Sequence, residues 1–144
     1  MSKRIIMKKL TVLWIDDQRN PIKYLNGNNK SNAFYRNKEF YDELAKSYDI
    51  YFVWVKNLYQ FVNHIKNNGL PNFISFDYDL NSREGGEGLT GLQKSNNNGI
   101  NCARWLIKYC KETNQTLPKF YVHSANPKHG PEINKTLNNA PKEK

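Results

Sequence analysis

The chain has 144 residues and a formal net charge of +9, and 38% of its residues are hydrophobic, including 7 Phe, 9 Tyr and 3 Trp. This length suits one domain and excludes two, and the bulky apolar side chains suffice for a core, which excludes a wholly disordered chain. The longest apolar runs are far shorter than the roughly 20 residues of a membrane-spanning helix, so we expect no transmembrane segment.

Four short segments rich in β-branched and aromatic residues predict strands at residues 10–15, 49–55, 72–76 and 119–122. The first, LTVLWI, is a nearly continuous apolar run, which is typical of a strand covered on both faces. Helical patterns alternate with these strands. This alternation predicts an α/β fold, in which a parallel sheet carries helices on both faces.

Apolar residues recur at helical spacing after each strand. In the clearest case, Asn57 is placed to cap the start of a helix and Gly69 to end it. Cys102 and Cys110 lie more than two turns apart in another predicted helix, so they cannot form a disulfide with each other. The predicted helices cover residues 40–48, 58–65, 100–110 and 133–137.

Two segments show neither helical nor strand periodicity: the polar residues 18–31 and the Gly- and Asn-rich residues 80–99. A loop as long as the second is usually functional or disordered when it occurs in a compact domain. Its glycines favour a mobile lid that closes over a substrate, and a flexible linker is the alternative interpretation.

Four of the six aspartates follow two of the predicted strands, Asp16 and Asp17 after the first and Asp77 and Asp79 after the third. Ligands of open parallel sheets bind beyond the carboxyl ends of the strands, so these carboxylates are expected to share a crevice. Their mutual repulsion calls for a divalent cation, and oxygen ligands favour Mg²⁺ or Mn²⁺. The alternative is that some of them cap helices or pair with lysines.

The fourth predicted strand is followed by His123, Ser124 and Asn126. An imidazole near carboxylates and a metal can act as a general acid or base. The hydroxyl of Ser124 and the amide of Asn126 suit phosphate oxygens, and they equally suit a turn before Pro127.

The excess of basic residues, 22 Lys and Arg against 13 Asp and Glu, favours polyanionic partners such as nucleic acid. Because no contiguous run of five or six basic residues stands out, the same excess also fits a solvated surface. The N-terminal sequence MSKRIIMKKL lacks the apolar stretch of a secretory signal, so we expect a cytoplasmic protein.

The motifs WIDDQRNP, ISFDYDLN and VHSANP resemble those of the cyclic-phosphate-processing receiver family, a derived branch of the response-regulator receiver domains. That family has an acid pair followed by Arg and Pro, then D-H-D-L, then H-S-x-N-P. The resemblance covers about residues 10–138 and implies a receiver-like (flavodoxin-like) doubly wound parallel sheet, truncated to about four strands. A basic extension (1–9) and a tail (139–144) flank it. Tyr78 stands where the family commonly has His, and the fifth strand with its lysine is missing.

The resemblance implies that the protein processes cyclic phosphates, for example the 2′,3′-cyclic ends of damaged RNA or cyclic nucleotides, in RNA repair and in phage and bacterial conflict. We expect a metal-dependent phosphoesterase whose nucleophile is either water or Asp77, and a phage-encoded protein acting in a bacterial host fits this setting. One alternative is a non-catalytic module that binds metal and an anionic ligand or partner protein, such as a cyclic-nucleotide sponge. Another is nucleic-acid binding through the basic charge alone.

The predicted site combines three groups of residues. The expected catalytic residues are Asp77, Asp79 and His123, the expected ligands of Mg²⁺ or Mn²⁺ are Asp16, Asp17 and Asp77, and the expected phosphate-binding residues are Arg19, Ser124 and Asn126. The planar fork of Arg19 is well suited to phosphate oxygens.

Overall fold

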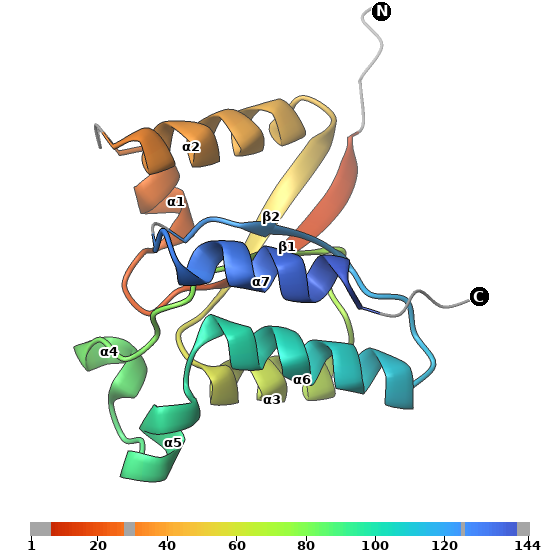
Figure 1. Ribbon diagram of the computed structural model, residues 1–144. Helices are drawn as coiled ribbons and strands as arrows, with labels where there is room; N and C mark the ends of the chain where they lie inside the picture. The colour runs from red at the N-terminus through yellow and green to blue at the C-terminus, as the bar shows by residue number, and fades with distance from the viewer. Residues whose placement is uncertain (1–6, 28–30, 125, 141–144) are drawn as a thin grey trace, which may run out of the picture.

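The computed structural model describes residues 7–27, 31–124 and 126–140. Its strands are β1 (Lys8–Ile15), β2 (Tyr48–Val55), β3 (Phe73–Phe76) and β4 (Lys119–Val122). They form one parallel sheet in the order β2-β1-β3-β4 (Figure 1). The chain therefore adds a strand on one side of β1 and then crosses to the other side, which confirms the predicted doubly wound sheet.

Helices cover both faces of this sheet (Figure 1). The short helix α1 (Pro21–Leu25) and the longer α2 (Asn32–Ala45) lie on one face, and α3 (Leu58–Asn68), α6 (Gly99–Glu112) and α7 (His129–Asn138) lie on the other. None of the described helices has both the length and the apolar character needed to cross a membrane. Of the predicted extension and tail, residues 1–6 and 141–144 lie outside the described residues, and β1 begins two residues before its predicted start.

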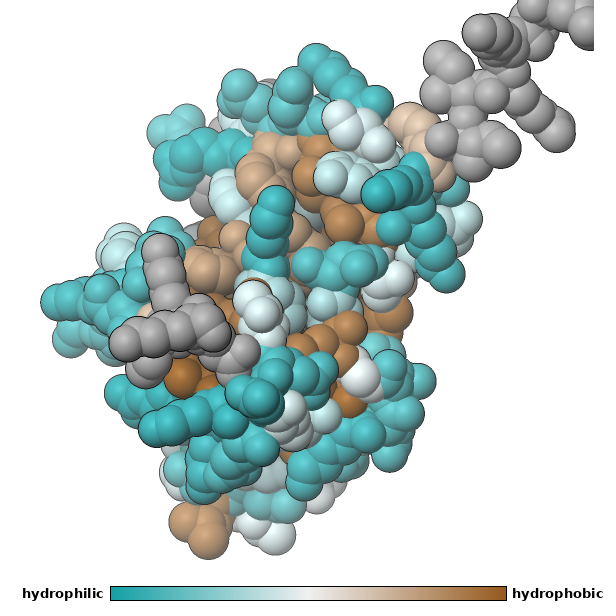
Figure 2. Space-filling view, turned by 90° about the vertical axis from the view of Figure 1, so that its right-hand side faces the viewer, coloured by the Kyte–Doolittle hydropathy of each residue, from teal (hydrophilic) through white to brown (hydrophobic). Residues whose placement is uncertain are grey.

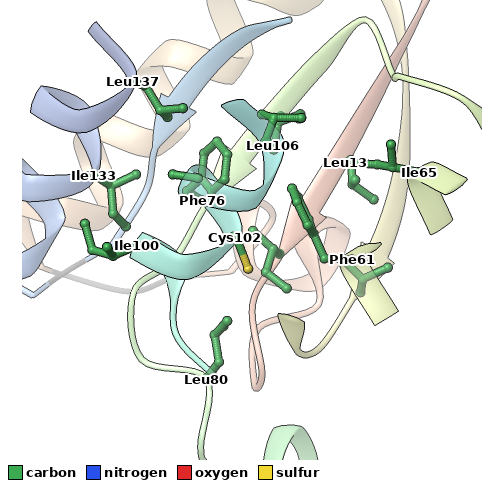
Figure 3. Close-up of a cluster of buried hydrophobic side chains, with 14 of the residues drawn as sticks. Leu13, Phe61, Ile65, Phe76, Leu80, Ile100, Cys102, Leu106, Ile133 and Leu137 are labelled. Atoms are coloured by element: carbon green, nitrogen blue, oxygen red, sulfur yellow. The ribbon is translucent and has the colours of Figure 1, made fainter. Parts of the chain in front are cut away.

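The alternation of side chains along β1 divides the core into two clusters. Val12 and Trp14 pack under α1 and α2, whereas Leu13 and Ile15 pack under the three helices of the opposite face. All four side chains are fully buried, as expected of a strand covered on both faces. Figure 3 shows the larger cluster, which includes Phe61, Phe76, Cys102, Leu106 and Ile133.

Local sequence signals explain where several helices begin and end. The side chain of Asn57 accepts a hydrogen bond from the backbone N–H of Gln60 (2.8 Å), and Gly69 ends α3 with a φ of 84°, so both predicted caps are confirmed. Cys102 and Cys110 are both buried and form no disulfide with each other, as expected.

Residues 80–99 are not the irregular segment that the sequence predicts, because they contain α4 (Arg83–Gly86) and α5 (Gly91–Asn96). A capping box formed by Thr90 and Gln93 starts α5. The two ends of the segment are joined by an antiparallel bridge between Asp79 and Asn98. Short local helices without an apolar stripe leave no periodicity in the sequence, which is why they were not predicted. The polar segment that follows β1 likewise contains α1, which begins at a capping Asn followed by Pro.

Gly99 fixes the approach of α6 to the end of β3. A Cβ atom at this position would overlap the carbonyl oxygen of Asp77 and would lie 2.8 Å from the side chain of Ile133. The backbone N–H of Gly99 donates a hydrogen bond to the carbonyl oxygen of Tyr78 (2.8 Å), so the helix cannot move away without losing this bond.

We predict that Gly99→Ala destabilises the protein by about 3 kcal/mol, because overpacking against backbone cannot be relieved by a rotamer change. In a domain of this size the loss should lower the Tm by roughly 10 °C, which thermal unfolding followed by circular dichroism would measure. The control is Gly91→Ala, where no atom lies within 4 Å of the added Cβ. An equal loss of Tm in both variants would contradict this account.

Candidate functional site

Three aspartates meet at the carboxyl ends of the two central strands. Asp16 and Asp17 follow β1, and Asp77 follows β3, which pairs with β1. Ligand atoms of these three side chains lie within 4.8 Å of one another, although each residue is at most 6% exposed. The predicted convergence of Asp16, Asp17 and Asp77 is therefore confirmed.

Asp16 is held in its ionised form by a dense set of donors. The backbone N–H groups of Gln18 and Arg19 donate to Oδ1 (2.9 and 2.8 Å), and the ring nitrogen Nε2 of His123 lies 3.0 Å from Oδ2. Burial raises the pKa of Asp16, but the hydrogen bond and charge of His123 and the two backbone donors outweigh it, so the pKa lies below its ordinary value.

His123 lies behind Asp16, enclosed by other side chains, and not in the open position that the predicted acid or base role would need. It is 1% exposed, its ring stacks on the indole of Trp14 (centroids 3.7 Å apart), and its Nδ1 lies 2.8 Å from the hydroxyl oxygen of Ser75. Burial lowers the pKa of His123 in spite of the nearby Asp16 carboxylate, so the ring is neutral near pH 7. Because the ionised Asp16 can only accept, Nε2 carries the hydrogen and Nδ1 accepts from Ser75.

Two tryptophans fix the turn that carries Asp16. The indole N–H of Trp54 donates to the backbone carbonyl oxygen of Asp16 (2.7 Å), and that of Trp14 donates to the carbonyl oxygen of Arg19 (2.9 Å). The guanidinium of Arg19 lies 3.5 Å from Asp16 Oδ2 and 5.4 Å from the ring centroid of Tyr24. The guanidinium of Arg19 is thus held between Asp16 and the ring of Tyr24.

Asp17 is tied to the segment between β3 and α6. The backbone N–H of Ser82 donates to Asp17 Oδ2 (2.8 Å). Gly85 approaches so closely that an added Cβ would lie 2.5 Å from the Cβ of Asp17. Burial raises the pKa of Asp17, the bonds from Ser82 lower it, and the charge of Asp16 adds to the rise, which leaves the pKa above its ordinary value. The residues 80–99 therefore form a wall of the site.

Asp77 is the aspartate of the cluster whose ionised form is most strongly disfavoured. Burial and the neighbouring Asp16 carboxylate raise its pKa to about 7, although Arg19 and a hydrogen bond from Ser124 oppose the rise. Without a cation, Asp77 therefore titrates near neutral pH. A divalent ion bound to the three carboxylates would remove the repulsion, and an all-oxygen donor set fits Mg²⁺ or Mn²⁺.

The three acids open into a polar pocket of about 440 Å³. Asp79 and Asn126 stand on its wall, where the side-chain N–H of Asn126 donates to Asp79 Oδ2 (3.1 Å). Of the predicted site residues, six line this pocket: Asp16, Asp17, Arg19, Asp77, Asp79 and Asn126. His123 and Ser124 do not line it: the enclosed His123 contacts Asp16, and the side chain of Ser124 hydrogen-bonds to Asp77.

A sequence model of the family described as "Cyclic-phosphate processing Receiver domain" matches residues 11–139. The chain belongs to this family. The match includes the whole sheet except the first three residues of β1, and it includes both strand ends that carry the acids. It confirms the resemblance that the sequence motifs indicate and the receiver-like α/β fold.

Other comparisons add little to the family assignment. A comparison with curated proteins finds no match. Among solved structures, a trimeric coiled-coil segment of yeast Spc42 fused to another protein is similar, with 14% identity and a TM-score of 0.47. The alignment covers 93% of this chain and 62% of that chain, so this chain spans less than two thirds of the fusion.

Several residues of the site were not predicted from the sequence. Asn97 is buried, accepts a hydrogen bond from the backbone N–H of Leu58 (2.8 Å) and donates to the carbonyl oxygen of Leu80 (2.8 Å), so it anchors the pocket wall to α3. Nothing distinguishes it in a run of three asparagines. Ser75 has no signal either, because a single serine inside a buried strand is unremarkable until its partner His123 is known.

We predict that Mg²⁺ raises the Tm of this receiver domain and that the rise grows as the pH increases toward 7. The ordinary pKa of Asp77 is 3.8, and in the folded protein it is about 7. Between these values the native state holds a proton that the unfolded state has released, so without metal the free energy of unfolding falls as the pH rises. Metal binding must displace this proton, and its affinity therefore increases with pH.

Thermal melts at pH 5.5, 6.5 and 7.5, with and without millimolar Mg²⁺, would measure both effects. Asp77→Asn should remove the response to Mg²⁺ and reduce the loss of metal-free stability between about pH 4 and 7, leaving the smaller contribution of Asp17, whose pKa is also raised. Asp42→Asn, at an exposed position of α2, is the control and should retain both. A Tm that is indifferent to metal at every pH would rule out the ion site.

Proposed function

We propose that this receiver domain is a metal-dependent phosphoesterase that opens cyclic phosphates of nucleotides or RNA ends. The observation that carries the proposal is the convergence of three buried carboxylates on a polar pocket whose wall also presents an arginine, a fourth aspartate and an amide. The family's description names the processing of cyclic phosphates. Hydrolysis would break one P–O ester bond of the ring and leave a phosphomonoester.

Asp16, Asp17 and Asp77 would hold Mg²⁺ or Mn²⁺, which when bound polarises a phosphoryl oxygen and offsets charge that develops at phosphorus. The other pocket residues provide binding and proton transfer. Arg19 lies on the pocket wall beside Asp16, and its charge lowers the pKa of Asp77; there it would bind a non-bridging phosphate oxygen. The amide of Asn126 would provide a further contact.

Asp79 is the pocket residue best placed to move a proton. It is exposed to solvent and lies on the pocket wall, and its orientation is set by Asn126. It would take the proton from an attacking water, or give one to the oxygen that leaves phosphorus. His123, which the sequence suggests for this task, is a positioning residue in our proposal: it donates to Asp16 and has no access to the pocket.

The test is turnover on RNA with a 2′,3′-cyclic phosphate end and on a panel of 2′,3′- and 3′,5′-cyclic mononucleotides, with Mg²⁺ or Mn²⁺. We predict that Asp77→Asn lowers kcat/KM by about a thousandfold or more and that Asp79→Asn lowers kcat by about a hundredfold. Borohydride reduction of quenched reactions would identify the nucleophile, because only an aspartyl phosphate at residue 77 is trapped. Absence of product with every substrate would refute the proposal.

We also predict that Arg19→Ala raises KM at least tenfold while the Mg²⁺-dependent rise in Tm persists at pH 8. The reason is that Asp16 is held by the backbone N–H of Arg19, which the substitution retains. The higher pH is needed because the guanidinium lowers the pKa of Asp77, which rises when the charge is removed. Arg19→Lys, which keeps the charge without the planar fork, should be intermediate. If Arg19→Ala instead abolished the Mg²⁺-dependent rise in Tm as well as raising KM, Arg19 would be part of the ion site.

A second candidate function is a non-catalytic module that binds metal and a cyclic nucleotide. The observation that favours it is the lack of any imidazole among the described residues that line the pocket, since Tyr78 stands where the family commonly has His and His123 is enclosed. Isothermal titration calorimetry with the same nucleotide panel distinguishes the two, because tight metal-dependent binding without product supports the module.

A further inference from the structure

The edge of the sheet at β4 presents unpaired backbone groups. Within the described residues, β4 pairs only with β3. The N–H of His123 donates to the carbonyl oxygen of Phe76 on β3 (2.9 Å), and the direction of backbone groups alternates along a strand. The N–H and C=O groups of Phe120 and Val122 therefore point outward, away from β3. Such an edge is a template for another strand.

A large groove lies beside the start of this edge, at the opposite end of the sheet from the acids. Its volume is about 1130 Å³, and it runs between the end of α6, the end of α7 and the first residues of β4. Its apolar lining includes Phe73, Ile107, Leu117, Phe120 and Leu137. Figure 2, which faces this side of the molecule, shows hydrophobic surface between hydrophilic regions. The groove offers apolar contacts directly next to free backbone hydrogen-bonding groups.

The charged residues that line the groove are all basic. Arg104, Lys108, Lys111 and Lys119 line it, and no Asp or Glu of the described residues does so. Lys108 makes a surface ion pair with Glu112 (3.8 Å), which leaves most of the positive charge uncompensated by ion pairs among the described residues. A second copy of this chain would bring equal charges together at a two-fold β4–β4 contact, so the groove selects against self-association.

We propose that the β4 edge binds an extended acidic segment of a partner protein, which adds a fifth strand to the sheet. Backbone groups of the segment would pair with Phe120 and Val122, its apolar side chains would enter the groove, and its carboxylates would face the lysines and Arg104. RNA would also be attracted by the positive charge, but RNA cannot form the backbone hydrogen bonds of a β-ladder or fill the apolar part of the groove. The interaction leaves the acid pocket at the other end of the sheet accessible, and it does not depend on the proposed hydrolysis.

The test uses the synthetic peptide EVEIEVEI, which alternates acidic and apolar residues, and the full chain. We predict that fluorescence anisotropy detects binding at low salt and that the matched peptide KVKIKVKI binds at least tenfold more weakly. Lys111→Gln combined with Lys119→Gln should weaken binding of EVEIEVEI at least tenfold. The control is Lys46→Gln combined with Lys66→Gln, two exposed lysines outside the groove, which should leave the affinity unchanged.

Hydrogen exchange followed by NMR separates strand addition from simple charge attraction. On binding of EVEIEVEI, the amides of Phe120 and Val122 should exchange at least tenfold more slowly, while those of β2 at the opposite edge stay unchanged. Three outcomes would overturn the proposal: equal binding of the two peptides, binding without protection of these amides, or displacement of the peptide by the single-stranded RNA U15. A dimer at working concentration whose contact protects the same two amides in the absence of peptide would overturn it as well.

Discussion

Repulsion among three carboxylates at the end of β1 and β3 is the constraint around which the structure is arranged. The fold brings Asp16, Asp17 and Asp77 together at a buried position, and it stabilises their ionised forms to different extents. Asp16 accepts hydrogen bonds from His123 and from two backbone N–H groups and stays ionised, whereas Asp77 titrates near neutral pH. A cation bound to this set would displace the proton of Asp77.

The groups that hold Asp16 come from distant parts of the chain and belong mainly to the layer under α1 and α2. Trp14 stacks on His123, His123 bridges Ser75 and Asp16, and Trp54 fixes the backbone of Asp16. Because all of them are packed against the core or the turn, the position of the carboxylate is set by the rigid part of the domain. Precise placement of this kind is what binding sites need from the residues that surround their ligands.

The sequence predicts the sheet and the acids well, because both follow from strong and local patterns. The run LTVLWI can hardly be anything except a buried strand, and the aspartates at residues 16, 17 and 77 follow directly after strands that the topology makes neighbours. His123 was misplaced for a physical reason: its position after β4 is correct, but the direction of its ring depends on Trp14 and Ser75, which no local pattern connects to it. The helices in residues 80–99 were missed because hydrogen bonds to Asn97 and Asp17, and not an apolar stripe, hold that segment in place.

The segment between β3 and α6 has two halves that differ in how much they contact the rest of the domain. Its inner half, with Ser82, Gly85 and Asn97, touches the acids and the core, while α5 in its outer half buries no residue, and Leu92 is 76% exposed. A substitution in α5 therefore removes no buried side chain. Substitutions or insertions there would change the surface near the pocket without displacing the buried carboxylates.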